Sequence, residues 1–264
     1  MKCISSLILV LVIGNALSGC ASSSRGQSKA QAPASREIVL GESRSRAKAH
    51  TDLGFEYYAQ RQYGVALQEV RVALKDDSSY TPTYNLLALI NMELNDEVAA
   101  EDAFQRALQL SPGDPEIANN YGWFLCKTKR EQQSFRYFNL ALQNPLYPTP
   151  SRALDNAADC YIQIRDFKSA ESYLNRALVL VPSDVRALLA MANVKYLQKQ
   201  HAEARGYLAE AHRNSEPSSV SAWLALRIAR QTGNREDEAR YLSLLRKKFP
   251  DSEEYKKLLQ GNFE

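Results

Sequence analysis

Few side chains in this 264-residue sequence have the types and spacing that catalysis requires. The three histidines, His50, His201 and His212, do not stand in a metal-binding or nucleophile–base pattern. Asp155 and Asp159 lie four residues apart, so on a helix both carboxylates would share one face. Such a pair can perform acid–base chemistry, but a charged surface patch is its more frequent role. We therefore predict no enzyme, no metal, no cofactor and no small-molecule substrate.

Cysteine is the other chemically reactive residue type, and its positions differ in meaning. Cys20 follows a short apolar run from Ile4 to Leu17 that is too interrupted for a membrane span. The sequence Leu17-Ser18-Gly19-Cys20 resembles the bacterial lipobox. That resemblance implies that residues 1–19 are a signal peptide, that Cys20 is lipidated, and that Ala21 directs the protein to the outer membrane. The alternative is an ordinary secretory signal with a chance cysteine.

Residues 20–45 are rich in Ser, Ala, Gln and Arg and lack aromatic side chains. Because such a segment buries little apolar surface, we predict a flexible tether, with a helical extension from Arg36 as the alternative.

Removal of the predicted signal peptide takes away Lys2, so the 33 basic residues become 32, which against 30 acidic residues leaves a net charge of +2. This balance gives no electrostatic argument for nucleic-acid binding.

Small and apolar residues recur from Ala47 onward at intervals of 34, 34, 36 and 34 residues. The small residues are Ala66, Ala100, Ser134, Ala170 and Ala204, each followed four residues later by a large apolar one. The period and pattern resemble the tetratricopeptide repeat. The resemblance implies an all-α superhelical solenoid over residues 46–264, with about six helix-turn-helix units. We expect a degenerate sixth unit whose helices are shifted by one residue, then a capping helix over Asp251–Gln260.

The third unit carries two extra residues within the segment 143–150, which contains three prolines. Proline favours extended backbone in the residue before it, so this connection should be extended. Two interpretations remain open: the loop serves a partner, or it re-aims the fourth unit.

Cys126 and Cys160 fall on the first helices of the third and fourth units. Successive first helices are neighbours in this architecture, and the two cysteines are offset by about 3 Å along the helix axis. A disulfide fits that offset and an oxidising periplasm. The alternative is two buried free thiols.

First helices also line the concave groove of such a solenoid, which commonly binds proteins. The predicted groove residues are Asn85, Leu89, Asn119, Trp123, Asp155, Asp159 and Ile162. Asn85 and Asn119 are expected to hydrogen-bond the backbone of an extended peptide, and Leu89, Trp123 and Ile162 to hold its side chains.

The string from Asn119 to Cys126 (NNYGWFLC), with Tyr147-Pro148-Thr149-Pro150 and Cys160, resembles the type IV pilus biogenesis and stability proteins called PilW or PilF. That resemblance implies a lipid-anchored outer-membrane protein with its body in the periplasm. It also implies a non-enzymatic role in secretin multimerisation or localisation, or in pilus stability, with secretin subunits or other pilus proteins as partners. It matches Cys20 to the lipidated position and Cys126–Cys160 to a disulfide. The alternative function is a repeat lipoprotein that regulates a peptidoglycan synthase or an outer-membrane assembly complex.

Overall fold

The computed structural model describes residues 33–263, and the side chains from Gly41 onward. Contacts divide the chain into two units, 1–40 and 41–264, and the second holds the repeats. The predicted signal peptide, Cys20 and residues 21–32 lie outside the described residues.

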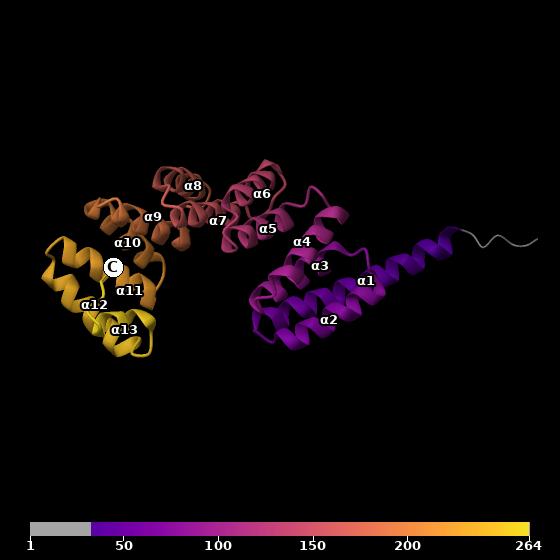
Figure 1. Ribbon diagram of the computed structural model, residues 1–264, viewed down its shortest axis with the longest axis horizontal. Helices are drawn as coiled ribbons and strands as arrows, with labels where there is room; N and C mark the ends of the chain where they lie inside the picture. Colours follow the sequence, from indigo (N-terminus) through magenta and orange to yellow (C-terminus); the bar gives the residue numbers. More distant parts are fainter. Residues whose placement is uncertain (1–32, 264) are drawn as a thin grey trace, which may run out of the picture. The chain divides into compact units, whose positions relative to one another are not determined.

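The described chain contains thirteen α-helices and no strand, as the repeat pattern predicts (Figure 1). Twelve of them form six antiparallel pairs, and a short helix follows. The helices are α1 (Pro33–Ala59), α2 (Tyr63–Asp76), α3 (Thr81–Glu93), α4 (Glu97–Leu110), α5 (Pro115–Lys127), α6 (Glu131–Gln143), α7 (Pro150–Gln163), α8 (Phe167–Leu180), α9 (Val185–Leu197), α10 (His201–Asn214), α11 (Ser219–Gln231), α12 (Arg235–Lys248) and α13 (Glu253–Leu259).

One backbone device repeats in the turn within every helix pair. A residue with positive φ, between 59° and 69°, ends the first helix; these are Arg61, Asn95, Lys129, Arg165, Lys199 and Gly233. The next residue donates its N–H to the carbonyl five positions earlier, as Gln62 does to Tyr57 at 2.9 Å. This is a Schellman motif, which satisfies carbonyls that the helix end leaves free.

The same turn fixes the register of the sixth unit. Gly233 follows Lys199 by 34 residues, and α11 and α12 begin 34 residues after α9 and α10. The predicted one-residue shift is therefore wrong. Glu238 stands where the earlier units have a small residue, and its carboxylate accepts a hydrogen bond from Arg230 Nε at 2.7 Å. The small residues of the pattern are lost in this unit while the backbone pattern continues.

Small residues let the two helices of a pair approach closely. The five predicted small residues, Ala66 to Ala204, are fully buried. On α5, a Cβ added to Gly122 would lie 2.9 Å from the Phe138 ring, closer than real Cβ contacts allow. Only glycine therefore fits there, and Phe138 fills the space between the third and fourth units.

The predicted flexible tether is wrong for its last thirteen residues, because α1 begins at Pro33 and continues to Ala59. The helical alternative describes this stretch better. Arg46 Nε lies 3.0 Å from Asp76 Oδ1, and Arg44 Nη1 lies 3.5 Å from Asp77 Oδ2. These ion pairs hold the start of the repeat region of α1 to the end of α2, which composition alone does not reveal.

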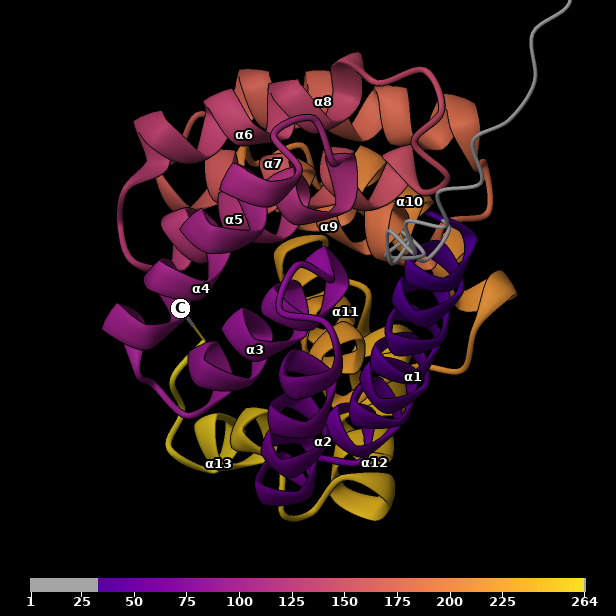
Figure 2. The ribbon, with the colours of Figure 1, turned by 90° about the vertical axis from the view of Figure 1, so that its right-hand side faces the viewer.

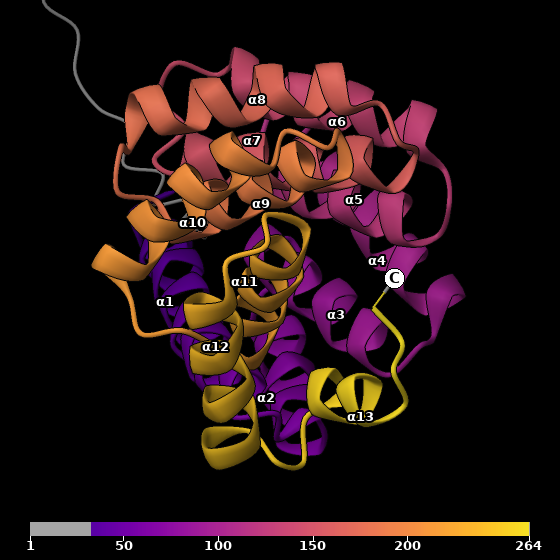
Figure 3. The same cartoon turned by 90° about the vertical axis from the view of Figure 1, so that its left-hand side faces the viewer.

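The first helices of successive units contact one another, from α3 through α5, α7 and α9 to α11. Within residues 41–264, Figures 2 and 3 show α5, α7 and α9 as an inner layer and α6 and α8 as an outer one. We call the surface formed by α3, α5, α7, α9 and α11 the first-helix wall. Across the described residues, every helix is too short or too polar to span a bilayer.

Candidate functional site

All seven predicted groove residues lie on the first-helix wall, on α3, α5 and α7. Their accessibility divides them into two sets. Asn85, Asn119 and Asp155 are buried. Leu89, Trp123, Asp159 and Ile162 remain partly exposed and are able to contact a partner.

The buried set occupies one repeated position, ten residues before the positive-φ turn residue. In the six units this position holds Thr51, Asn85, Asn119, Asp155, Leu189 and Trp223. The first four are buried polar side chains. Because buried polar groups require partners, this column places a polar seam inside the wall.

Hydrogen bonds join Asn85 and Asn119 of this seam to one another and to α7 and α9 through neighbouring side chains. On the α9 side, Arg186 Nη2 donates to Asn156 Oδ1 at 2.8 Å, and Asn156 Nδ2 donates to Asn119 Oδ1 at 2.9 Å. Asn119 Nδ2 then donates to Asn120 Oδ1 at 3.2 Å, and Asn120 Nδ2 donates to Asn85 Oδ1 at 3.1 Å. We call the chain from Arg186 to Asn85 the amide network.

The amide network corrects the prediction for the asparagines. Asn119 is fully buried, and both ends of its amide are engaged within the protein. Asn85 is also buried, with its oxygen occupied. The expected backbone hydrogen bonds from Asn119 to a peptide are therefore wrong, and these amides instead tie neighbouring units together. Periodicity located the position but did not reveal that its polar groups satisfy one another.

Asp155 occupies the same repeated position, but its carboxylate is not fully hydrogen-bonded. Its Oδ1 is buried and has no hydrogen-bond partner among the described residues. The pKa of Asp155 is raised to about 7, chiefly by burial and also by the nearby carboxylates of Asp184 and Asp159, against the opposing effect of Arg186. Neutral pH is therefore close to the pKa of the Asp155 carboxyl.

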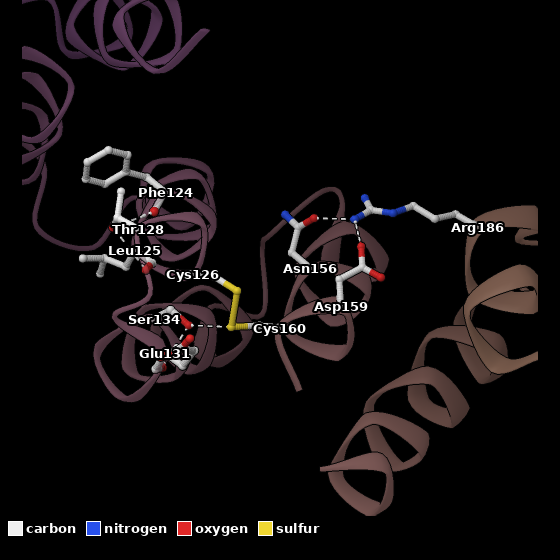
Figure 4. Close-up of a disulfide and its surroundings, with 10 residues drawn as sticks. All are labelled: Phe124, Leu125, Cys126, Thr128, Glu131, Ser134, Asn156, Asp159, Cys160 and Arg186. Atoms are coloured by element: carbon white, nitrogen blue, oxygen red, sulfur yellow. Dashed lines mark hydrogen bonds and ion pairs between the residues drawn. A yellow bond between two sulfur atoms is a disulfide. The ribbon is translucent and has the colours of Figure 1, made fainter. Parts of the chain in front are cut away.

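Asp159, one turn along α7, has a different environment. Its Oδ2 accepts a hydrogen bond from Arg186 Nη2 at 2.7 Å (Figure 4). In Figure 4, Asn156 and Asp159 both point toward this guanidinium. Asp155 and Asp159 thus do not form an acid–base pair around a shared substrate position.

A hollow of about 290 Å³ opens on the wall where α9 and α11 meet α7. Its lining includes Asp159, Arg186, Leu189, Asn193, Val220 and Arg227. Of the seven predicted groove residues, only Asp159 lines this hollow, and the α9 and α11 residues that complete it were not among the seven. We call this feature the wall hollow.

The wall hollow combines an apolar floor with charge. Arg227 lies with its guanidinium 4.5 Å from the centroid of the Tyr196 ring, a cation–π distance. Its Nε is buried and lacks a hydrogen-bond partner among the described residues. With Val220 exposed beside it, the hollow can accept an apolar side chain next to a positive charge.

Farther along the wall, Trp123 offers a second contact surface. Lys127 Nζ lies 4.6 Å from the centroid of its indole ring. Trp123 packs partly against the cluster formed by Cys126, Phe135, Phe138, Ala157 and Cys160. The ring is thereby held in place with one side accessible.

Cys126 and Cys160 form a disulfide between α5 and α7, with their Cα atoms 5.9 Å apart (Figure 4). Both residues are fully buried, and Ser134 Oγ lies 3.4 Å from Cys160 Sγ. The bond fastens the third unit to the fourth directly behind Trp123. Among the described residues, no group of three or more His, Cys, Asp or Glu side chains is arranged to hold a metal.

Comparison with known proteins identifies relatives over nearly the whole chain. The tetratricopeptide repeat family matches residues 51–115 and 156–219. The crystal structure of PilW, described as a widely conserved type IV pilus biogenesis factor, is 33% identical with a TM-score of 0.75. The match covers 81% of this chain and 98% of PilW. The chain belongs to the PilW and PilF family of type IV pilus biogenesis proteins.

Proteins named PilF are also among the relatives. The type IV pilus assembly protein PilF of Pseudomonas aeruginosa is 26% identical over 251 residues, which covers 95% of this chain and 96% of PilF. A solved structure of Pseudomonas aeruginosa PilF superposes with a TM-score of 0.72 and covers 84% of this chain. The similarity to these pilus biogenesis proteins therefore extends over most of the chain and is not confined to one segment.

Proposed function

We propose that this protein is a non-enzymatic assembly factor for type IV pili that holds a segment of a secretin or another pilus protein on its first-helix wall. The wall hollow between α7, α9 and α11 carries the proposal. It is the place where an exposed valine, the arginine Arg227 and an ion pair between Arg186 and Asp159 converge. Membership in the PilW and PilF family supports the pilus context.

The wall is prearranged for this task. The amide network fixes four helices relative to their neighbours, and the disulfide fixes two of them covalently. A partner segment therefore meets a surface that needs little further ordering, which lowers the entropic cost of binding. Val220 and Leu189 would contact apolar side chains of the segment, and the positive charge of Arg227 would attract one of its carbonyl or carboxylate oxygens.

In this proposal Cys20 carries lipid that anchors the protein to the periplasmic face of the outer membrane. The body then hangs in the periplasm, where secretin subunits arrive. Holding the body at the membrane raises the effective concentration of the wall near its partner.

Val220→Glu tests the wall hollow directly, because Val220 is 64% exposed and its replacement should leave the core intact. In cells that carry only this variant, we expect fewer pili, less twitching and fewer heat-stable secretin multimers. Val98→Glu on α4, at an exposed valine away from the wall, is the matched control.

A photo-crosslinker at position 220 identifies the partner. Capture of secretin or another pilus subunit supports the proposal. Normal pili and multimers with Val220→Glu, or capture of a peptidoglycan synthase instead, would overturn it in favour of the alternative function.

A further inference from the structure

A second apolar hollow lies on the other side of the repeats, between the ends of α6 and α8. Its volume is about 500 Å³, and its apolar lining includes Leu142, Pro145, Tyr147, Leu154, Val179 and Leu180. Val179 is 81% exposed, and the adjacent Leu146 is 86% exposed. We call this feature the α6–α8 pocket. In Figures 2 and 3, α6 and α8 belong to the outer layer, away from the first-helix wall.

The fold does not require an apolar residue at position 179. Val179 lies fourteen residues after the positive-φ residue of its unit. The equivalent residues in the other five units are Lys75, Gln109, Gln143, Arg213 and Lys247. All five are long and polar, as expected for a solvated face of a helix. The exposed valine is therefore specific to this unit and has no role in repeat packing.

The extra residues of the third unit build the opposite side of the pocket. Asn144 Oδ1 accepts a hydrogen bond from the backbone N–H of Leu146 at 2.9 Å, and the Asn144 carbonyl accepts one from Tyr147 N–H at 3.2 Å. Tyr147 is buried and anchors the turn. Leu146 is thus displayed on a fixed turn, which favours binding because little further order is lost.

The charge around the pocket indicates what it accepts. Arg176 is the single charged residue in the lining. Its guanidinium lies 5.2 Å from the centroid of the Tyr173 ring and forms no ion pair with any described residue. A partner with a carboxylate beside aliphatic side chains would pair with Arg176 and cover Val179, Leu180 and Leu146.

We propose that the α6–α8 pocket is a second docking site, which binds a protein segment with aliphatic side chains next to a carboxylate. Exposed apolar patches rimmed by polar groups mark such interaction sites. The pocket shares no lining residue with the wall hollow, so this inference stands or falls separately from the proposed function.

A displayed library of random twelve-residue peptides, selected against the purified full-length chain, tests the proposal. We expect the selected peptides to be enriched in leucine, isoleucine or phenylalanine close to aspartate or glutamate. Fluorescence anisotropy with one selected peptide then measures affinity for each variant. Val179→Lys, which copies the residue of the first and sixth units, should weaken binding about tenfold or more, and Arg176→Ala should weaken it several-fold.

Val98→Lys is the matched control, since Val98 is 74% exposed on another second helix, and it should bind as wild type does. Unchanged melting of Val179→Lys establishes that the variant is folded. Selected peptides that bind Val179→Lys and wild type equally, or that are basic, would overturn the proposal. Concentration-dependent self-association that Val179→Lys abolishes would also overturn it, because a second copy of the chain would then be the occupant.

Discussion

At the scale of single residues, Asp155 is a buried side chain of the wall whose Oδ1 lacks a hydrogen-bond partner among the described residues. Its equivalents in the second and third units are Asn85 and Asn119, which are neutral and hydrogen-bonded. The carboxyl of Asp155 is buried with a pKa of about 7. Protonation makes it resemble an amide, so the folded protein favours the neutral form.

This preference predicts a pH-dependent stability. An aspartate in the unfolded chain has a pKa of about 3.9, so between about pH 4 and pH 7 the folded state holds a proton that the unfolded state releases. The contribution of Asp155 to the free energy of unfolding is therefore most favourable below pH 4 and falls as pH rises toward 7. Asp155→Asn should stabilise the protein at pH 8 by about 2–4 kcal/mol and have little effect at pH 4.

Thermal unfolding of wild type and Asp155→Asn across this pH range measures the difference. Asp102→Asn, at an exposed position on α4, removes a carboxylate of equal charge and should follow the wild-type curve. A constant difference between wild type and Asp155→Asn at every pH would show that proton uptake at this site is not its cause.

At the scale of elements, the disulfide joins first helices whose cysteines are 34 residues apart in sequence. On the chain-entropy model, closing a loop of that length stabilises the folded state by roughly 3–4 kcal/mol, less any loss of packing. The double variant Cys126→Ala, Cys160→Ala should accordingly unfold at a lower urea concentration. Alanine suits both positions because each cysteine is buried and small.

The control is wild type unfolded in the presence of a reductant, which should approach the double variant. Alkylation of the native protein without reductant should leave both cysteines unmodified. Equal urea midpoints for all three samples would contradict a stabilising clamp.

Most elements were predictable because small residues recur where paired helices touch, as Ala100 and Ala170 illustrate. The register of the sixth unit was not, since Glu238 and Leu245 replace the small residues there. Gly233, 34 residues after Lys199, was the signal that would have fixed its register. The groove was predicted as a surface, but the burial of Asn119 was not, because a periodic pattern does not show which polar groups bond to one another.

At the scale of the whole described body, each unit is stable only because a neighbour covers it. In the sixth unit, the chain after α12 covers α11. The Phe263 ring stacks on Trp223 with centroids 5.5 Å apart, and the Arg230 guanidinium lies 3.7 Å from the Phe263 ring centroid. These contacts keep Trp223 buried at the end of the core.

Deletion of residues 253–264 should therefore loosen the repeats from the C-terminal end. We expect α11 and α12 to unfold at a lower temperature than the disulfide-linked third and fourth units, which would separate one melting transition into two. In a Trp123→Phe background, Trp223 is the remaining tryptophan, so its emission should shift to the red at the first transition. The single variant Phe263→Ala should show a smaller shift in the same direction, because it removes the stacking contact but keeps α13. A truncated protein that melts in one step, with Trp223 emission unchanged until that step, would show that the sixth unit needs no cover.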